Sequence, residues 1–434
     1  MNKKILHLAV PAIVSNITVP LLGLIDVAIV GHLGSAAYIG AIAVGGLLFN
    51  IIYWLFGFLR MGTSGFTSQA FGKGDMQEVS YALVRALSVG MVISLCLLLL
   101  QIPIERIAFR LIDAGEEVKQ FASIYFRICI WGAPAVLGLY GLSGWFIGMQ
   151  NARHPMLVAI TQNIVNILVS LLLVFGLKMK VEGVAIGTLV AQYSGFLMAL
   201  FIQRRFYRHT RTAIRWREVM NKSEIRRFFS INRDIFLRTL CLVAVTTFFT
   251  TTGARQGDVI LAVNTLLMQL FTLFSYFMDG FAYAGEALTG LFVGGKNSDQ
   301  LRLMIRNLFR WGILLSLSAT LLYAFGGRSF LSLLTNETAV IEEAMHYFYW
   351  VLAIPLAGFA AFLWDGILIG ATASRLMLIA MLVAAGSFFL LFYLFYPTLG
   401  NHALWLAFIV YLLLRGVMMT VMWNRSGIAA SSGR

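Results

Sequence analysis

Charged residues are scarce in this chain, and their scarcity excludes most soluble folds. Only 12% of the 434 residues are Asp, Glu, Lys or Arg, whereas 59% are hydrophobic and the mean hydropathy is +0.83. So apolar a composition also excludes the disordered and collagen-like classes. It indicates an integral membrane protein, since twelve spans of about 20 residues would need roughly 240 apolar positions.

Cysteine is nearly absent as well, which excludes a disulfide scaffold. The three cysteines are Cys96, Cys129 and Cys241, and each lies alone within an apolar run. None belongs to a Cys-x-x-Cys pair or stands near a histidine cluster. We interpret them as packing residues and expect neither a bound metal nor a cofactor.

Long apolar segments predict twelve transmembrane helices. Each is long enough to cross a hydrocarbon layer of about 30 Å as a helix. The first contains Pro11 and Asp26 and has no small-residue cleavage site, so we interpret it as a retained span rather than a signal peptide. The predicted spans are residues 8–30, 40–70, 82–103, 121–149, 155–177, 183–203, 231–252, 258–293, 307–326, 340–371, 374–397 and 402–422.

The 33 basic residues are unevenly distributed between the two sets of loops. With the N-terminus placed in the cytoplasm, 22 of the 33 fall on the cytoplasmic side and seven on the opposite side. The remaining four lie within or at the ends of spans: Arg60, Arg127, Arg238 and Arg415. Because Lys and Arg accumulate in cytoplasmic loops, this asymmetry predicts a cell (inner) membrane protein with both termini cytoplasmic. The basic loop between spans six and seven, and with it the net charge of +14, is then explained by anionic membrane lipids and not by nucleic acid.

The same loop divides the chain near residue 217, and the two halves are similar in sequence. When the numbering is shifted by 223, GFLRMGTSGFTSQAFGKGD (57–75) aligns with GFAYAGEALTGLFVGGKNS (280–298); when it is shifted by 222, GWFIGMQNAR (144–153) aligns with GILIGATASR (366–375). Each half has six spans and hence the same membrane orientation. We predict an all-α membrane fold of two homologous six-helix lobes, residues 1–217 and 218–434, around a central cavity. That architecture is typical of alternating-access transporters.

Motifs along nearly the whole chain resemble the multidrug and toxic compound extrusion (MATE) family. They are the first span with Asp26 and GHLG (31–34), then TSQAFGKGD, GWFIGMQNAR and GVAIGT (183–188). FLRMG (58–62), RDIFLRTL (233–240), FMDGFAYAGEAL (277–288) and WDGILIG (364–370) resemble its DinF-like branch. The resemblance implies a secondary active exporter of drugs or toxic compounds, driven by inward flow of protons or sodium, and not an enzyme.

One carboxylate lies deep within the N-terminal half, where an ionisable group is a functional candidate. A rise of 1.5 Å per residue places Asp26 roughly 27 Å from the cytoplasmic face and both Ser170 and Thr188 at roughly 22 Å. Asn166 and Asn163 lie about one and two turns below Ser170. We predict that these five side chains form a proton- or cation-coupling site.

The family pattern on span five is Asn followed four residues later by Asp, but here the pair is Asn166 and Ser170. Where the family pairs two carboxylates, this chain therefore keeps only Asp26. Burial without a cationic neighbour favours the protonated form of a carboxylate, which favours proton coupling. A sodium ion at Asp26 remains the alternative, with Ser170 supplying an oxygen.

Two prolines in the first span, Pro11 and Pro20, each remove a backbone hydrogen bond beside the candidate carboxylate. A bendable helix next to an ionisable group suits a conformational switch, so we predict a hinge. A static kink is the alternative interpretation.

Further ionisable and adaptable side chains point to a substrate cavity. Asp365 and Glu286 come to roughly 15 and 14 Å from the cytoplasmic face, and Asp279 lies two turns from Glu286. Such carboxylates would attract small, amphipathic, cationic compounds or form a second ion site. Alternatively, they would form structural ion pairs with Arg60. Asp234 and Arg238 have the i, i+4 spacing of a simple ion pair. The predicted cavity residues are Arg60, Met61, Phe66, Asp279, Glu286 and Asp365.

Two other functions are alternatives to export by a monomeric transporter. A flippase for lipid-linked saccharides has a related two-lobe fold but needs cationic cavity residues for a pyrophosphate. A membrane-embedded lipid- or glycosyl-modifying enzyme would need ionisable residues in a large outer loop, and the predicted outer loops are short. No HExxH or GxSxG motif is present.

Overall fold

The structure is a computed structural model that describes residues 1–32, 35–112, 115–210 and 214–428. Throughout these ranges the regular elements are helices, and no strand occurs. Within them, twelve helical segments are long and apolar enough to cross a membrane, which confirms the predicted number. The end of the GHLG motif (31–34) and two of the counted basic residues, Arg211 and Arg434, lie outside the described residues.

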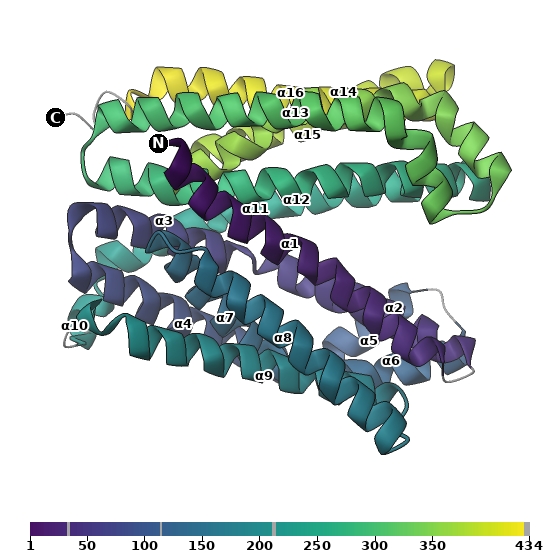
Figure 1. Cartoon of the computed structure of the whole chain (residues 1–434), viewed down its shortest axis with the longest axis horizontal. Coiled ribbons are helices and arrows are strands. Elements are labelled where there is room, and N and C mark those ends of the chain that lie inside the picture. The colour runs from purple at the N-terminus through teal and green to yellow at the C-terminus, as the bar shows by residue number, and fades with distance from the viewer. Residues whose placement is uncertain (33–34, 113–114, 211–213, 429–434) are drawn as a thin grey trace. The chain divides into compact units, whose positions relative to one another are not determined.

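The chain as far as the end of the sixth span forms nine α-helices, a 3₁₀ turn and a π turn (Figure 1). The helices are α1 (Asn2–Gly31), α2 (Ala36–Leu55), α3 (Phe58–Lys73), α4 (Met76–Leu99), α5 (Gln101–Leu111), α6 (Glu116–Cys129), α7 (Ala133–Gly148), α8 (Arg153–Leu171) and α9 (Val181–Phe206). Eight of these helices form the spans, and α5 lies between the third and fourth spans. Spans two and four are compound, since α2 with α3, and α6 with α7, are each almost continuous.

The second six spans are single long helices. After the short α10 (Trp216–Val219) they are α11 (Lys222–Arg255), α12 (Asp258–Gly294), α13 (Ser298–Leu334), α14 (Thr338–Gly370), α15 (Ser374–Leu399) and α16 (Asn401–Ser426). Most begin earlier or end later than predicted, because polar residues beyond the hydrocarbon layer continue the helix.

One helix, α5, was not predicted. It has only 11 residues, too few for a span, and its sequence IPIERIAFR alternates with a helical period. Ile107 and Leu111 are exposed, whereas Glu105 is buried and its carboxylate lies 3.0 Å from Nε of Arg127 on α6. The segment after span three is therefore a short amphipathic helix tied to span four.

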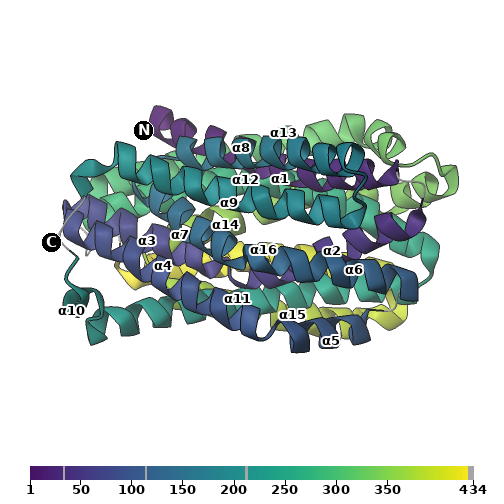
Figure 2. The ribbon, with the colours of Figure 1, turned by 90° about the horizontal axis from the view of Figure 1, so that it is seen from below.

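The chain forms two compact units, Val14–Phe228 and Met1–Ile13 together with Phe229–Arg434. The start of α1, as far as Ile13, thus groups with the second unit. Within the first unit, α8 and α9 run side by side, as both views show (Figure 1 and Figure 2).

The same close helix crossing occurs once in each unit. A Cβ atom on Gly144 of α7 would lie 2.2 Å from the carbonyl oxygen of Arg60 on α3. A Cβ on Gly366 of α14 would lie 2.1 Å from the carbonyl oxygen of Ala282 on α12. Gly366 corresponds to Gly144, and Ala282 to Arg60, when the numbering is shifted by 222. Both partners of the crossing therefore repeat, and neither crossing has room for a side chain.

Helix termini repeat with the same shift. Left-handed residues end α3 at Gly74 (φ 76°) and follow α12 at Lys296 (φ 52°), and they also follow α7 at Gln150 (φ 62°) and α14 at Thr372 (φ 54°). In both pairs the numbering again differs by 222. The structure therefore aligns segment 57–75 at a shift of 222, one less than the predicted 223; the shared Gly-Phe and Gly-Lys pairs had favoured the wrong register.

The linker after α9 is attached to the first unit. Glu218 of α10 accepts hydrogen bonds from the hydroxyl of Tyr81 (2.8 Å) and from Gln77 (3.0 Å) on α4. Hydrogen bonds from Tyr81 and Arg215 to this exposed carboxylate hold its pKa below the usual value. The linker between α9 and α11 is therefore held against α4 by hydrogen bonds between side chains of α10 and α4.

Candidate coupling and substrate site

Asp26 is buried near the end of α1, with 6% of its surface exposed. Its Oδ1 atom accepts no hydrogen bond from any of the described residues. A buried carboxylate oxygen without a donor is costly when charged, and adding a proton or a cation removes that cost.

The predicted amide and hydroxyl partners meet between α8 and α9. Nδ2 of Asn166 donates a 3.1 Å hydrogen bond to Oγ1 of Thr188, and Oγ of Ser170 donates a 3.5 Å hydrogen bond to Oδ1 of Asn166. Asn166 and Ser170 are both fully buried. A Cβ atom on Gly187 would lie only 2.1 Å from Oγ of Ser170, so the glycine provides the room for this polar group.

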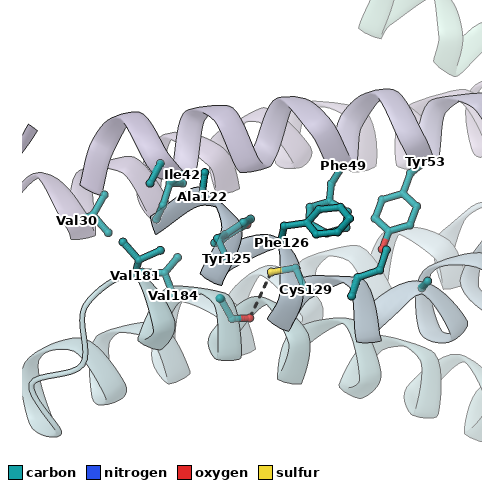
Figure 3. Close-up of a cluster of buried hydrophobic side chains, with 14 of the residues drawn as sticks. Val30, Ile42, Phe49, Tyr53, Ala122, Tyr125, Phe126, Cys129, Val181 and Val184 are labelled. Atoms are coloured by element: carbon teal, nitrogen blue, oxygen red, sulfur yellow. Dashed lines mark hydrogen bonds between the residues drawn. The ribbon is translucent and has the colours of Figure 1, made fainter. Parts of the chain in front are cut away.

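Tyr125 of α6 connects this polar group to the carboxylate, and the sequence did not single it out. Its phenol lies beside the hydroxyl of Thr188 and the thiol of Cys129, and it interacts with the charge of Asp26. Figure 3 shows Tyr125 and Cys129 among apolar side chains, with the Cys129 thiol directed at the carbonyl oxygen of Ala185 3.6 Å away. The ring of Tyr125 fits because Gly45 of α2 has no side chain; a Cβ there would be 2.4 Å from the ring.

Asn163, which is also predicted to belong to the coupling site, contacts α1. Its Nδ2 donates a 3.0 Å hydrogen bond to the backbone carbonyl oxygen of Thr18 on α1. This bond attaches α8 to α1 two residues before Pro20. α1 remains helical through both Pro11 and Pro20, so the predicted hinge lies within a continuous helix.

The corresponding positions of the second unit are aromatic. At the repeat offset of 222, Asp26 corresponds to Phe248, Asn166 to Phe388 and Ser170 to Phe392. The ring of Phe248 lies 5.9 Å from that of Phe388 and 5.0 Å from that of Phe392, both edge-to-face. The polar group of the first unit thus has an apolar counterpart, and the two units are not equivalent in chemistry.

Asp365 of α14 lies between two buried arginines. Its Oδ2 accepts a 2.9 Å hydrogen bond from Nη1 of Arg238 on α11 and a 2.6 Å hydrogen bond from Nη2 of Arg415 on α16. The guanidinium of Arg415 also lies 5.3 Å from the ring centroid of Tyr411. Asp365, Arg238 and Arg415 together carry a formal charge of +1.

The predicted Asp234–Arg238 pair has a different arrangement. Asp234 lies 3.1 Å from Arg233, the residue before it, and accepts a 3.0 Å hydrogen bond from the hydroxyl of Ser374. Arg238 is directed to Asp365 instead. The i, i+4 spacing therefore did not decide the pairing.

The other acidic candidates lie on α12. Glu286 is 1% exposed and belongs to the close crossing with α14, where a Cβ on Gly370 would be 2.2 Å from the Glu286 carbonyl oxygen. Asp279 is half-buried, and Tyr276 one turn earlier interacts with its charge. Glu286 is therefore buried at a helix crossing, whereas Asp279 is partly accessible.

The remaining candidates lie on α3. Phe66 is buried, its ring stacks on Phe228 with centroids 5.6 Å apart, and the guanidinium of Arg227 lies 5.3 Å from its centroid. Arg60 and Met61 are half-buried at the start of the same helix. Phe66 is thus covered by residues from the first part of α11.

The chain is similar in sequence to known membrane proteins over nearly its whole length. The MatE family model matches residues 11–172 and 235–394. DNA damage-inducible protein F of Escherichia coli (strain K12) is 38% identical over 424 residues, which cover 98% of this chain and 92% of that protein. The probable multidrug resistance protein NorM of Acinetobacter baylyi is 22% identical over 82% of this chain and 80% of its own length.

Solved structures share the fold. The bent form of the Vibrio cholerae MATE transporter VcmN superposes with a TM-score of 0.86 at 17% sequence identity, covering 99% of this chain and 97% of that one. An outward-facing multidrug resistance MATE family transporter superposes with a TM-score of 0.83 at 20% identity, covering 100% and 97%. At these identities the structures support the fold alone.

Proposed function

Since the chain belongs to the MatE family of membrane transporters, we propose that it exports small amphipathic compounds in exchange for protons that bind at Asp26. The family assignment makes it a transporter and excludes the alternative of a membrane-embedded enzyme. The coupling site would comprise Asp26 with Asn166, Ser170 and Thr188, and Asn163 would attach α8 to the moving helix.

The observation that carries this proposal is the buried Oδ1 of Asp26, which has no donor among the described residues. A proton bound there would remove the charge and make the carboxyl a hydrogen-bond donor, whereas a sodium ion would need several oxygens close together. The phenol of Tyr125 and the hydroxyl of Thr188 lie in the same buried region and can accept or donate a hydrogen bond as the carboxyl changes state. This supports protons over sodium as the coupling ion.

The two sequence halves, residues 1–217 and 218–434, would act as lobes of an alternating-access exporter that works as a monomer. Proton binding at Asp26 would favour one conformation of α1, and the helix would bend near Pro11 and Pro20. The aromatic group around Phe248 supports a single coupling site, because the second unit has no carboxylate at the equivalent position.

Substrates would be small and amphipathic, with a preference for cations near Asp279 and Glu286. Arg60 and Met61 would be further substrate-binding candidates in the first half, where Phe66 would act through its contact with Phe228. Asp365 contributes less to cation binding, because two arginines already neutralise it. The flippase alternative loses support for the same reason: Arg238 and Arg415 are both bound to Asp365 and leave only one excess charge for a pyrophosphate.

The coupling ion is tested with the purified protein in lipid vesicles loaded with a fluorescent cationic dye. We expect an imposed pH gradient to drive dye transport in sodium-free buffer, and an imposed sodium gradient at equal pH to drive none. Transport driven only by the sodium gradient would contradict proton coupling while leaving the exporter assignment intact.

We also propose that the protein lies in the inner membrane with both termini in the cytoplasm, as the distribution of basic residues favours. In a variant whose native cysteines are replaced by serine, Arg217→Cys should react with a membrane-impermeant maleimide only after the cells are opened. Arg217 is exposed on α10. The matched control is Lys178→Cys between α8 and α9, which should react in intact cells; the reverse pattern would invert the topology.

A further inference from the structure

A pocket of about 450 Å³ lies in the second unit, and none of the candidate coupling or cavity residues lines it. Its walls come from the first turns of α13, from α14 and from the end of α16. These helix ends are the ones that the basic residues assign to the cytoplasmic side of the membrane.

The charged part of the lining is entirely basic. Arg302 and Arg306 are one helical turn apart on α13, both are exposed, and neither has an acidic partner within 4.0 Å among the described residues. The uncharged lining consists of Ile305, Asn424 and Gly427 with two tryptophans. Since none of the described residues that line the pocket is acidic, the two arginines give it a formal charge of +2.

The floor of the pocket is aromatic and fixed. Trp364 is 3% exposed, its Nε1 donates a 2.7 Å hydrogen bond to Oγ1 of Thr420, and its ring lies 5.4 Å from that of Trp423. Trp423 is 5% exposed. The indole N–H of Trp364 is thus already bonded within the protein, and the pocket combines two cations with an apolar surface.

The internal repeat shows that these arginines are not needed for helix packing. At the offset of 222, Arg302 and Arg306 correspond to Ser80 and Val84 on α4. There the chain itself covers the site, since the Ser80 hydroxyl donates a hydrogen bond to the carbonyl oxygen of Thr210 in the linker. The second unit has exposed guanidinium groups where the first unit has an internal contact.

We propose that this pocket binds the phosphate headgroup of an anionic phospholipid from the cytoplasmic leaflet. The two guanidinium groups would hold the phosphate oxygens, and Ile305 with the tryptophans would contact the glycerol and the first acyl carbons. Tryptophan and arginine at a membrane–water boundary suit a ligand that is charged at one end and apolar at the other. A free phosphate has the same charge but would make no use of the aromatic floor.

The proposal is tested by thermal unfolding of the purified full chain in neutral detergent during titration with phosphatidylglycerol. A ligand that binds the folded state raises the unfolding temperature, and the titration gives an apparent affinity. For Arg302→Gln/Arg306→Gln we expect that affinity to fall about thirty-fold, which is about 2 kcal/mol at 1.4 kcal/mol per decade. Phosphatidylcholine should give no comparable stabilisation of either protein.

The matched control is Arg310→Gln, one turn further along α13, exposed and outside the pocket lining, which should bind like the unmodified chain. A second variant, Ile305→Trp, keeps both arginines but fills the pocket and should also lose the effect. Unchanged phosphatidylglycerol affinity in both pocket variants would overturn the proposal, as would an equal loss in Arg310→Gln. Equal stabilisation by inorganic phosphate alone would exclude the lipid as the ligand.

Discussion

Asp26→Asn is expected to reduce gradient-driven export to the level of protein-free vesicles, while the protein still folds. Asn has nearly the same size as Asp, and its uncharged amide resembles the protonated carboxyl, so the charge on the buried oxygen is removed. It cannot release a proton, so the proton-motive force, which contributes about 2.3 kcal/mol per charge per 100 mV, is no longer coupled to transport. Dye efflux from vesicles under an imposed pH gradient measures the loss.

The control for Asp26→Asn is Asp299→Asn, which removes an exposed carboxylate in the first turn of α13 and should export at the normal rate. Dye binding without a gradient separates coupling from folding, and Asp26→Asn should retain it. Normal export by Asp26→Asn under a pH gradient would show that the coupling site lies elsewhere, with Glu286 as the next candidate.

The residues around Asp26 help to interpret the Asp26→Asn result and provide a second variant. The equivalent aromatic group around Phe248 shows that the fold accepts an apolar version of these positions, so loss of activity in Asp26→Asn would not reflect a general need for polar contacts there. Ser170→Asp would restore the carboxylate pair of the family pattern. The new carboxylate would have to fit against the backbone at Gly187. Ser170 packs so closely there that even a Cβ atom on Gly187 would clash with its hydroxyl.

Sequence reasoning predicted a depth for each of these groups but not its rotation about the helix axis. Helical rise converts residue number into depth, and the equal depth predicted for Ser170 and Thr188 agrees with their shared contact to Asn166. Rotation about the axis is set by packing against several helices at once. The attachment of Asn163 to Thr18 therefore could not be predicted from spacing.

Aromatic residues were the hardest to recognise as part of the site. Tyr125 stands in an apolar run where one more ring gives no signal, and its position depends on the missing side chain of Gly45 on another helix. The apolar counterpart at Phe248, by contrast, could have been predicted from the sequence. Extending the repeat offset of 222 from the matched motifs to Asp26 would have revealed it.

The partners of Asp365 illustrate the same limit. Arg238 and Arg415 were recognised as basic residues within or at the ends of spans, and a buried cation requires a compensating anion. Several buried acidic residues and several cations allow many pairings, and only the packed structure selects Asp365 for both arginines.

Asp365→Asn is expected to destabilise the protein more than it alters substrate preference. Removing the carboxylate leaves Arg238 and Arg415 buried beside each other, and an uncompensated buried charge costs about 3–5 kcal/mol. We expect the unfolding temperature of the purified protein to fall by about 10 °C, and the surviving transport of cationic and neutral dyes to fall in equal proportion. A selective loss of cationic dyes at an unchanged unfolding temperature would instead identify Asp365 as a substrate-binding residue.

The triple variant Asp365→Asn/Arg238→Met/Arg415→Met distinguishes a charge effect from a packing effect. Buried ion pairs replaced by apolar residues of similar volume are often neutral or stabilising, because the desolvation cost disappears with the charges. The triple variant should therefore regain most of the unfolding temperature that Asp365→Asn loses. If it stays as unstable as the single variant, the shape of the Asp365 site, rather than the charge of its two arginines, would determine the stability of this unit.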